Sequence, residues 1–86
     1  MLIHLRFFAG VAAAIGLDEV SLEIPEGGTL GDLVQELNER FGAEDPERLA
    51  TILSVSSFLV EGRRADVSDP LADGQRVDVL PPFAGG

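Results

Sequence analysis

The sequence predicts an α+β roll in which one main helix packs on one face of a mixed sheet of about five strands. Three observations favour this fold. The chain has 86 residues, enough for a single hydrophobic core and too few for two. Several short segments alternate apolar and polar residues, as strands with one buried face do. One longer segment near the middle of the chain repeats its apolar residues at helical spacing.

Two strands are predicted near the start of the chain. Residues 2–9 alternate apolar and polar side chains, so they can bury one face of a strand. Residues 10–16 are rich in alanine and lie between two glycines, which indicates either a helical turn or a loop. Residues 18–24 alternate again, and the proline, glutamate and two glycines at 25–28 end this second strand.

The strongest helix signal follows this turn. Thr29 is a suitable N-cap residue, and Asp32 three positions later fits a capping box and complements the helix dipole. Apolar side chains then recur at helical spacing and define one buried stripe: Leu30, Leu33, Val34, Leu37 and Phe41. Gly42 stands where helices commonly end. We therefore predict the main helix between Thr29 and Gly42.

A shorter helix and three strands are predicted in the second half. Asp45-Pro46 begins a helical segment that ends near Leu53, since proline favours the first turn of a helix. The strands are predicted at 55–61, at 64–67 and at 76–80, separated by turn-forming residues. One helix laid over a sheet of these strands is the β-grasp arrangement.

Composition excludes several classes of function. Fifteen acidic and six basic residues give a net charge of −9, which disfavours binding to nucleic acids and to anionic membranes. The chain has no cysteine, so disulfides and thiolate metal sites are excluded. All six bases are arginine, so no side-chain amine can accept an acyl group. We find no secretory signal and no apolar run of membrane-spanning length, and we expect a cytoplasmic protein.

Side chains suited to catalysis are few. His4 is the only histidine, and it is predicted on the outward face of the first strand with no nucleophile at a diagnostic spacing. The acidic residues form no recognisable catalytic pair, and Gly27-Gly28 lacks the lysine of a phosphate-binding loop. We therefore expect no metal site, no bound cofactor and no catalysis by this chain alone.

The last six residues have a different character. Directly after the last predicted strand, the sequence ends Pro81-Pro82-Phe83-Ala84-Gly85-Gly86. Two prolines cannot donate to a sheet, so the chain must leave the sheet there. Residues 1–80 would form the domain, and residues 81–86 a flexible arm that reaches about 20 Å. The two glycines could pass through a narrow channel, and they leave the carboxylate of Gly86 sterically open.

A carboxylate at the end of such an arm has a specific use. It is a poor electrophile and needs activation, most simply as an acyl-adenylate made from ATP. The activated acyl group can then accept sulfur or an amine. Because the chain has no cysteine, it could hold a sulfur cargo only as a thiocarboxylate on Gly86. The predicted reacting atom therefore belongs to Gly86.

The order of elements and the C-terminal sequence resemble those of the ubiquitin-like sulfur carriers. The resemblance runs from Phe7-Phe8-Ala9 to Gly86, and its most specific parts are Pro70-Leu71-Ala72-Asp73-Gly74, Pro81-Pro82 and Gly85-Gly86. The chain is most similar to the family of small subunits of molybdopterin synthase (MoaD-type). Carriers of the thiamin pathway share the fold and the Gly-Gly end but generally lack the double proline. Glu61-Gly62 departs from the family, in which asparagine often precedes this turn.

The resemblance implies a sulfur-transfer cycle in molybdenum cofactor biosynthesis. A ubiquitin-activating-like adenylyltransferase would use ATP to adenylate Gly86, and a sulfurtransferase would convert it to the thiocarboxylate. The arm would then insert into the large subunit of molybdopterin synthase, within a heterotetramer of two small and two large subunits. There the sulfur would pass to a cyclic pterin phosphate. The arm itself would contact the partner, with Phe83 filling a pocket and Ala84 and Gly85 following it.

A partner-binding surface is also predicted beside the arm. In a β-grasp sheet the first, third and last strands adjoin, so their outward residues share one face. This face would hold three apolar residues beside four charged ones: Phe8, Leu59 and Leu80 with Arg6, Arg64, Arg76 and Asp78. Exposed apolar residues near the root of an arm suit contact with a partner protein. Pro81 and Pro82 would extend this surface into the arm.

The sequence leaves other functions open. The same chemistry could supply sulfur for thiamin, cysteine or another thio-metabolite. An activated Gly86 could instead be joined to lysines of other proteins, as in a ubiquitin-like modifier. A plain β-grasp interaction module is the third possibility, and an added C-terminal residue would not affect it.

Overall fold

The computed structural model describes residues 1–82 of the chain. Its elements, in chain order, are β1 (Leu2–Phe7), α1 (Ala9–Ile15), β2 (Glu19–Glu23), α2 (Leu30–Phe41), α3 (Pro46–Val55), β3 (Ser57–Val60), β4 (Arg63–Arg64) and β5 (Arg76–Leu80). Each predicted strand has a counterpart, and α2 is the predicted main helix. The alanine-rich segment folds as the helix α1. No helix within the described residues is long and apolar enough to cross a membrane.

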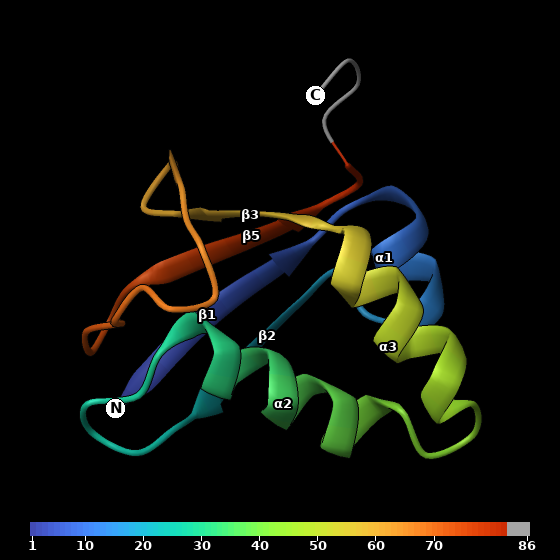
Figure 1. Cartoon of the computed structure of the whole chain (residues 1–86), viewed down its shortest axis with the longest axis horizontal. Helices are drawn as coiled ribbons and strands as arrows, with labels where there is room; N and C mark the ends of the chain where they lie inside the picture. The colour runs from blue at the N-terminus through green and yellow to red at the C-terminus, as the bar shows by residue number, and fades with distance from the viewer. Residues whose placement is uncertain (83–86) are drawn as a thin grey trace.

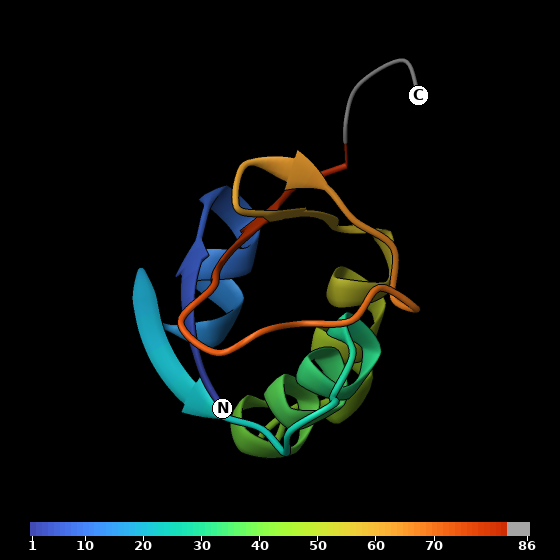
Figure 2. The same ribbon diagram turned by 90° about the vertical axis from the view of Figure 1, so that its left-hand side faces the viewer.

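The strands form one mixed sheet in the order β2-β1-β5-β3-β4. The last strand, β5, lies in the centre, parallel to β1 and antiparallel to β3, so the expected contact of these three strands is confirmed. Figures 1 and 2 show α2 and α3 on one side of the curved sheet. Because β1 and β5 are parallel, the chain begins at one end of the sheet and β5 finishes at the other (Figure 1).

The core lies between the sheet and the helices. The main helix begins as predicted, because a full capping box joins Thr29 and Asp32. The Asp32 carboxylate accepts a hydrogen bond from the Thr29 backbone N–H at 2.8 Å. The buried apolar side chains come from all three helices, from four strands and from two connecting segments: Ile3, Leu5, Phe7, Val11, Leu22, Ile24, Leu30, Leu33, Leu37, Leu49, Leu53, Phe58, Leu71, Val77 and Val79. Burial of each such side chain stabilises the fold by about 1.5–3 kcal/mol.

The end of α2 requires glycine for a steric reason. Gly42 directly follows the helix, as predicted, but its φ is −91°, which any residue can adopt. A Cβ at this position would collide with the carbonyl oxygen of Asn38. The close approach of the two backbone segments, rather than a left-handed conformation, therefore explains Gly42.

Three predicted strand boundaries are wrong. The first strand ends at Phe7 rather than at Ala9, because Ala9 begins α1. The third strand begins at Ser57, because residues up to Val55 continue α3. The apolar run around Val55 is too short for its periodicity to distinguish a strand from a helix. In the structure the hydroxyl of Ser56 donates a hydrogen bond to the Ile52 carbonyl at 2.7 Å and ends the helix. The fourth strand ends at Arg64 rather than near Val67. The Val67 carbonyl instead accepts a hydrogen bond from an N–H group in the first turn of α2 at 2.8 Å.

The turn between β3 and β4 explains how this chain accommodates glutamate, where the resemblance led us to expect asparagine. Glu61 and Gly62 both have positive φ, 49° and 80°, which is the geometry of a two-residue type I′ turn. Asparagine adopts this conformation more readily than glutamate. The Glu61 carboxylate, however, accepts a hydrogen bond from the Arg76 backbone N–H at 2.7 Å. Glutamate thus ties the turn to the central strand.

Candidate functional site

The root of the arm lies at the end of the central strand. Residues 76–80 form β5, and Pro81 and Pro82 follow as exposed residues outside the sheet. The predicted departure of the chain from the sheet at the double proline is therefore confirmed. Phe83, Ala84, Gly85 and Gly86, which carry the predicted reacting end, lie outside the described residues.

The face of the sheet opposite the helices brings together residues from all five strands. Strand pairing places five side chains in one row across this face: Arg64, Leu59, Asp78, Arg6 and Glu19. A neighbouring row holds Arg76, His4 and Ser21. Four of the six arginines of the chain belong to the strands of this sheet, although the chain as a whole has a net charge of −9. The predicted grouping of charged residues on this face is confirmed.

Asp78 differs from the prediction in its burial. It points to the outward face, as expected, but it is only 7% exposed. Arg6 covers it with two hydrogen bonds to the carboxylate, of 2.9 and 3.1 Å, and Arg76 lies 3.9 Å from the same group. The hydrogen bond to Asp78 raises the pKa of Arg6 above its ordinary value, so the guanidinium is charged at every physiological pH. This bidentate pair fixes β1 against β5 beside the arm.

The predicted apolar residues lie around this ion pair. Phe8 follows β1 and is 38% exposed, and its ring lies 5.6 Å from the guanidinium carbon of Arg6, within the range of a cation–π contact. Leu80 is half-buried and pairs across the sheet with Ser57, next to the arm. Leu59 is also half-buried, opposite Asp78. The structure thus brings Phe8, Leu59 and Leu80 to the same face as the arginines.

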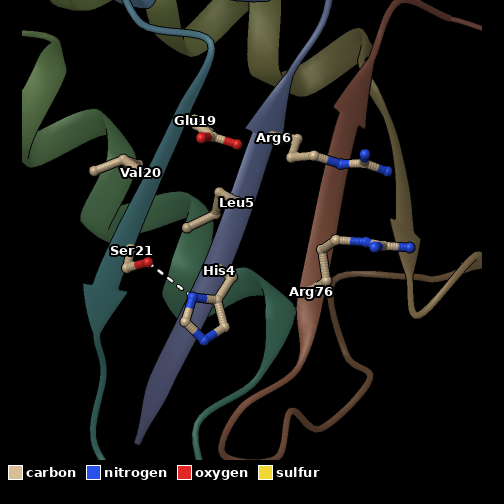
Figure 3. Close-up of a pocket in the computed structure, with 7 residues that line it drawn as sticks. All are labelled: His4, Leu5, Arg6, Glu19, Val20, Ser21 and Arg76. Carbon is tan, nitrogen blue, oxygen red and sulfur yellow. Dashed lines mark hydrogen bonds between the residues drawn. The ribbon is translucent and has the colours of Figure 1, made fainter.

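His4 borders a shallow depression on this face, shown in Figure 3. The depression has a volume of about 510 Å³ and lies over β2, β1 and β5. His4 Nδ1 and the Ser21 hydroxyl share a hydrogen bond of 2.8 Å, while Arg6 and Arg76 extend away from them. No group of three metal-ligating side chains occurs among residues 1–82. The depression therefore presents mostly polar side chains to solvent.

A separate hollow, which is apolar, adjoins Pro81 and Pro82 on the helical side of the sheet, and the sequence analysis missed it. It is a groove between α1 and α3, and Pro81 and Pro82 form part of its wall. Val55 lines this groove and is 56% exposed. The sequence analysis assigned Val55 to a strand and therefore did not place it beside α1. Val55 follows Leu49 and Ile52 at helical spacing, and this spacing could have indicated that the helix extends to Val55.

Comparison with known proteins connects this architecture to one family. The model of the ThiS family matches residues 5–86. Comparison with curated protein sequences found no match. Among solved structures, the chain is similar to one in the complex of subunits 1 and 2 of molybdopterin-converting factor from Helicobacter pylori, with 26% identity, full coverage of both chains and a TM-score of 0.68.

Two archaeal structures have the same fold. The HVO 2177 protein of Haloferax volcanii is 29% identical, with a TM-score of 0.80, and the match covers 100% of this chain and 87% of that one. Small archaeal modifier protein 1 of the same organism is 19% identical, with a TM-score of 0.80, over 95% and 98% of the two chains. The β-grasp fold predicted from the sequence is thereby confirmed. With its family match over nearly its whole length, the chain belongs to the ThiS family of small ubiquitin-like sulfur carriers.

Proposed function

We propose that this chain is the sulfur-carrying small subunit of a molybdopterin synthase. The observation that supports this most strongly is the central strand that leads into Pro81-Pro82, together with the Gly85-Gly86 sequence that follows. The similarity to a chain in a complex of molybdopterin-converting factor subunits supports the choice of pathway. The carrier would supply only the arm and the docking surface, and its partners would supply the catalytic groups.

The proposed cycle begins at the Gly86 carboxylate. One of its oxygens attacks the α-phosphate of ATP on an activating adenylyltransferase, and pyrophosphate leaves. The terminal sulfur of a sulfurtransferase persulfide then attacks the acyl carbon and AMP leaves, and a thiol reductant cleaves the resulting acyl disulfide to give the thiocarboxylate. In the large subunit the sulfur passes to a cyclic pterin phosphate, and water hydrolyses the acyl–sulfur bond, so that Gly86 returns to a carboxylate. No amine or thiol side chain of this chain can intercept the activated end, because the chain has neither lysine nor cysteine.

The intact mass of the chain tests the carrier function directly. The chain is incubated with ATP, the matching adenylyltransferase and a sulfur donor. We expect a mass increase equal to the replacement of one oxygen by sulfur, and fragmentation should place it on Gly86. No increase, with the same enzymes active on a control carrier, would contradict the proposal.

Joining of Gly86 to lysines of other proteins is the second candidate function. An adenylated carboxylate reacts with amines as well as with sulfur, and one protein of similar structure is a small archaeal modifier protein. Adducts of this chain linked through isopeptide bonds in a cell extract would favour this function. Their absence, with thiocarboxylate present, would favour sulfur transfer.

The outward face of the sheet is the proposed docking surface for these partners. We expect Leu80→Asp to weaken binding of the large subunit by about tenfold or more, because it places a charge at the centre of an apolar contact next to the arm. Titration calorimetry measures the affinity. The control is Leu17→Asp, since Leu17 is 42% exposed and lies outside the strands. Equal affinities of the two variants would show that this face does not bind the partner.

A further inference from the structure

The groove between α1 and α3 is a second surface that adjoins the arm. Its volume is about 280 Å³. Apolar side chains form most of it, with one arginine at its edge; the residues used in the argument are Val11, Ile52, Val55, Pro81, Pro82 and Arg48. Val11 is buried at its base, whereas Val55 is 56% exposed. The groove therefore presents apolar surface to solvent at the root of the arm.

Small residues on α1 keep this groove open. Gly10 and Ala13 face it from the helix, and a Cβ added at Gly10 would meet no atom within 4 Å. A larger residue at either position would fill the hollow with a side chain of the same chain. The free space and the exposed valine together suit an apolar side chain from outside residues 1–82.

The position of the groove indicates which molecule fills it. Pro81 and Pro82 belong to its wall, so a protein that encloses the arm must pass close to the groove. The proposed docking surface, with Phe8 and Leu80, lies on the other face of the sheet. A partner that encloses the arm would therefore contact the domain on two sides.

Charge specifies the chemistry of the contact further. Arg48 lines the groove, is exposed, and forms no ion pair with any residue of the described part of the chain. An arginine at the rim of an apolar hollow attracts a carboxylate and orients it beside the apolar contact. The fitting group is thus an apolar side chain flanked by an acidic residue.

We propose that this groove binds an apolar side chain, flanked by a carboxylate, on the large subunit that receives the arm. The inference rests on the proposed function and deepens it, because it names a second contact of the same partner. The outward face and the groove then hold the domain from both sides, so that the arm enters the partner in one orientation. Arg48 orients the partner by pairing with the carboxylate beside the apolar side chain.

Two matched substitutions test the groove. Val55→Glu places a charge in it, whereas Val67→Glu places the same charge on an equally exposed valine, 59% exposed, in the loop after β4. We expect Val55→Glu to bind the purified large subunit about tenfold more weakly than Val67→Glu. Both variants should be adenylated at the rate of the wild-type chain. Arg48→Glu should also weaken binding, and more strongly at low than at high salt.

Each other outcome overturns the assignment. Equal affinities of the two variants would show that the large subunit does not use the groove, although the wild-type chain is adenylated and binds. Slower adenylation of Val55→Glu would assign the groove to a surface shared with the activating enzyme. A wild-type dimer that Val55→Glu abolishes would make a second copy the occupant. If the wild-type chain is adenylated but does not bind the large subunit, the pathway assignment fails as well.

Discussion

Deletion of Gly86 should abolish sulfur transfer while the fold remains intact. The shortened chain would still end in a glycine carboxylate, but the reacting atom would stop one residue short, by about 3.5 Å. A misplacement of 1 Å at a reacting group can cost about 100-fold in rate, so we expect at least that loss in a reconstituted transfer assay. Within residues 1–82, the buried apolar side chains lie between Ile3 and Val79. The melting temperature of the variant should therefore equal that of the wild-type chain.

Two further substitutions in the arm distinguish the effect of its length from the effect of side-chain bulk. Ala84→Gly keeps the length and adds no bulk, so its activity should stay close to that of the wild-type chain. Gly85→Val also keeps the length and the terminal carboxylate, but it adds a side chain where a narrow channel would admit only glycine. We expect Gly85→Val to bind the large subunit and to fail in sulfur transfer.

Full activity of the Gly86 deletion with all partners present would contradict the carrier function.

Leu37→Ala should lower the stability of the fold strongly. Leu37 lies on the buried stripe of α2 and has no exposed surface. Truncation of a buried leucine costs about 2–5 kcal/mol in free energy of unfolding. A domain of this size has a total of only about 4–13 kcal/mol. We therefore expect a fall in melting temperature of about 8 °C or more, measured by circular dichroism or calorimetry.

The matched control for this variant is Leu17→Ala, because Leu17 is 42% exposed. Substitution of a surface residue usually changes stability by less than about 0.5 kcal/mol. Loss of less than about 1 kcal/mol in Leu37→Ala would contradict the packing of α2 against the sheet. Transfer activity of Leu37→Ala should return at low temperature, where the domain folds, whereas the Gly86 deletion should stay inactive at every temperature.

The local features of the fold could be predicted from the sequence. Thr29 and Asp32 are three residues apart, and their capping box forms within the first turn of α2, so no distant contact was needed to place the start of the helix. The same is true of the buried leucines of α2 and of the alternating strands. The departure of the chain at Pro81 and Pro82 follows from the chemistry of proline alone. These features depend on residues close together in the sequence.

Where neighbouring segments compete, the sequence was less informative. The apolar run that contains Val55 suits a strand or a helix, and packing of α3 beside α1 decides for helix. Residues 65–67 could extend β4, but the Val67 carbonyl accepts a hydrogen bond from the first turn of α2. Whether such a segment forms a helix, a strand or a loop depends on its contacts with distant segments, which secondary-structure propensity and periodicity do not describe.

The sequence by itself determined the β-grasp order of elements, the main helix with its cap, and the departure of the chain from the sheet at the two prolines that precede Phe83-Ala84-Gly85-Gly86. Only the tertiary structure decided how distant residues meet around that arm. Arg6 and Asp78 are separated by 72 positions, yet they form the bidentate pair that buries an aspartate on the outward face of the sheet. The groove beside Pro81 and Pro82 likewise exists only because α1 and α3 pack together. Local patterns specify helices and strands, whereas burial and surface shape depend on contacts between segments far apart in the chain.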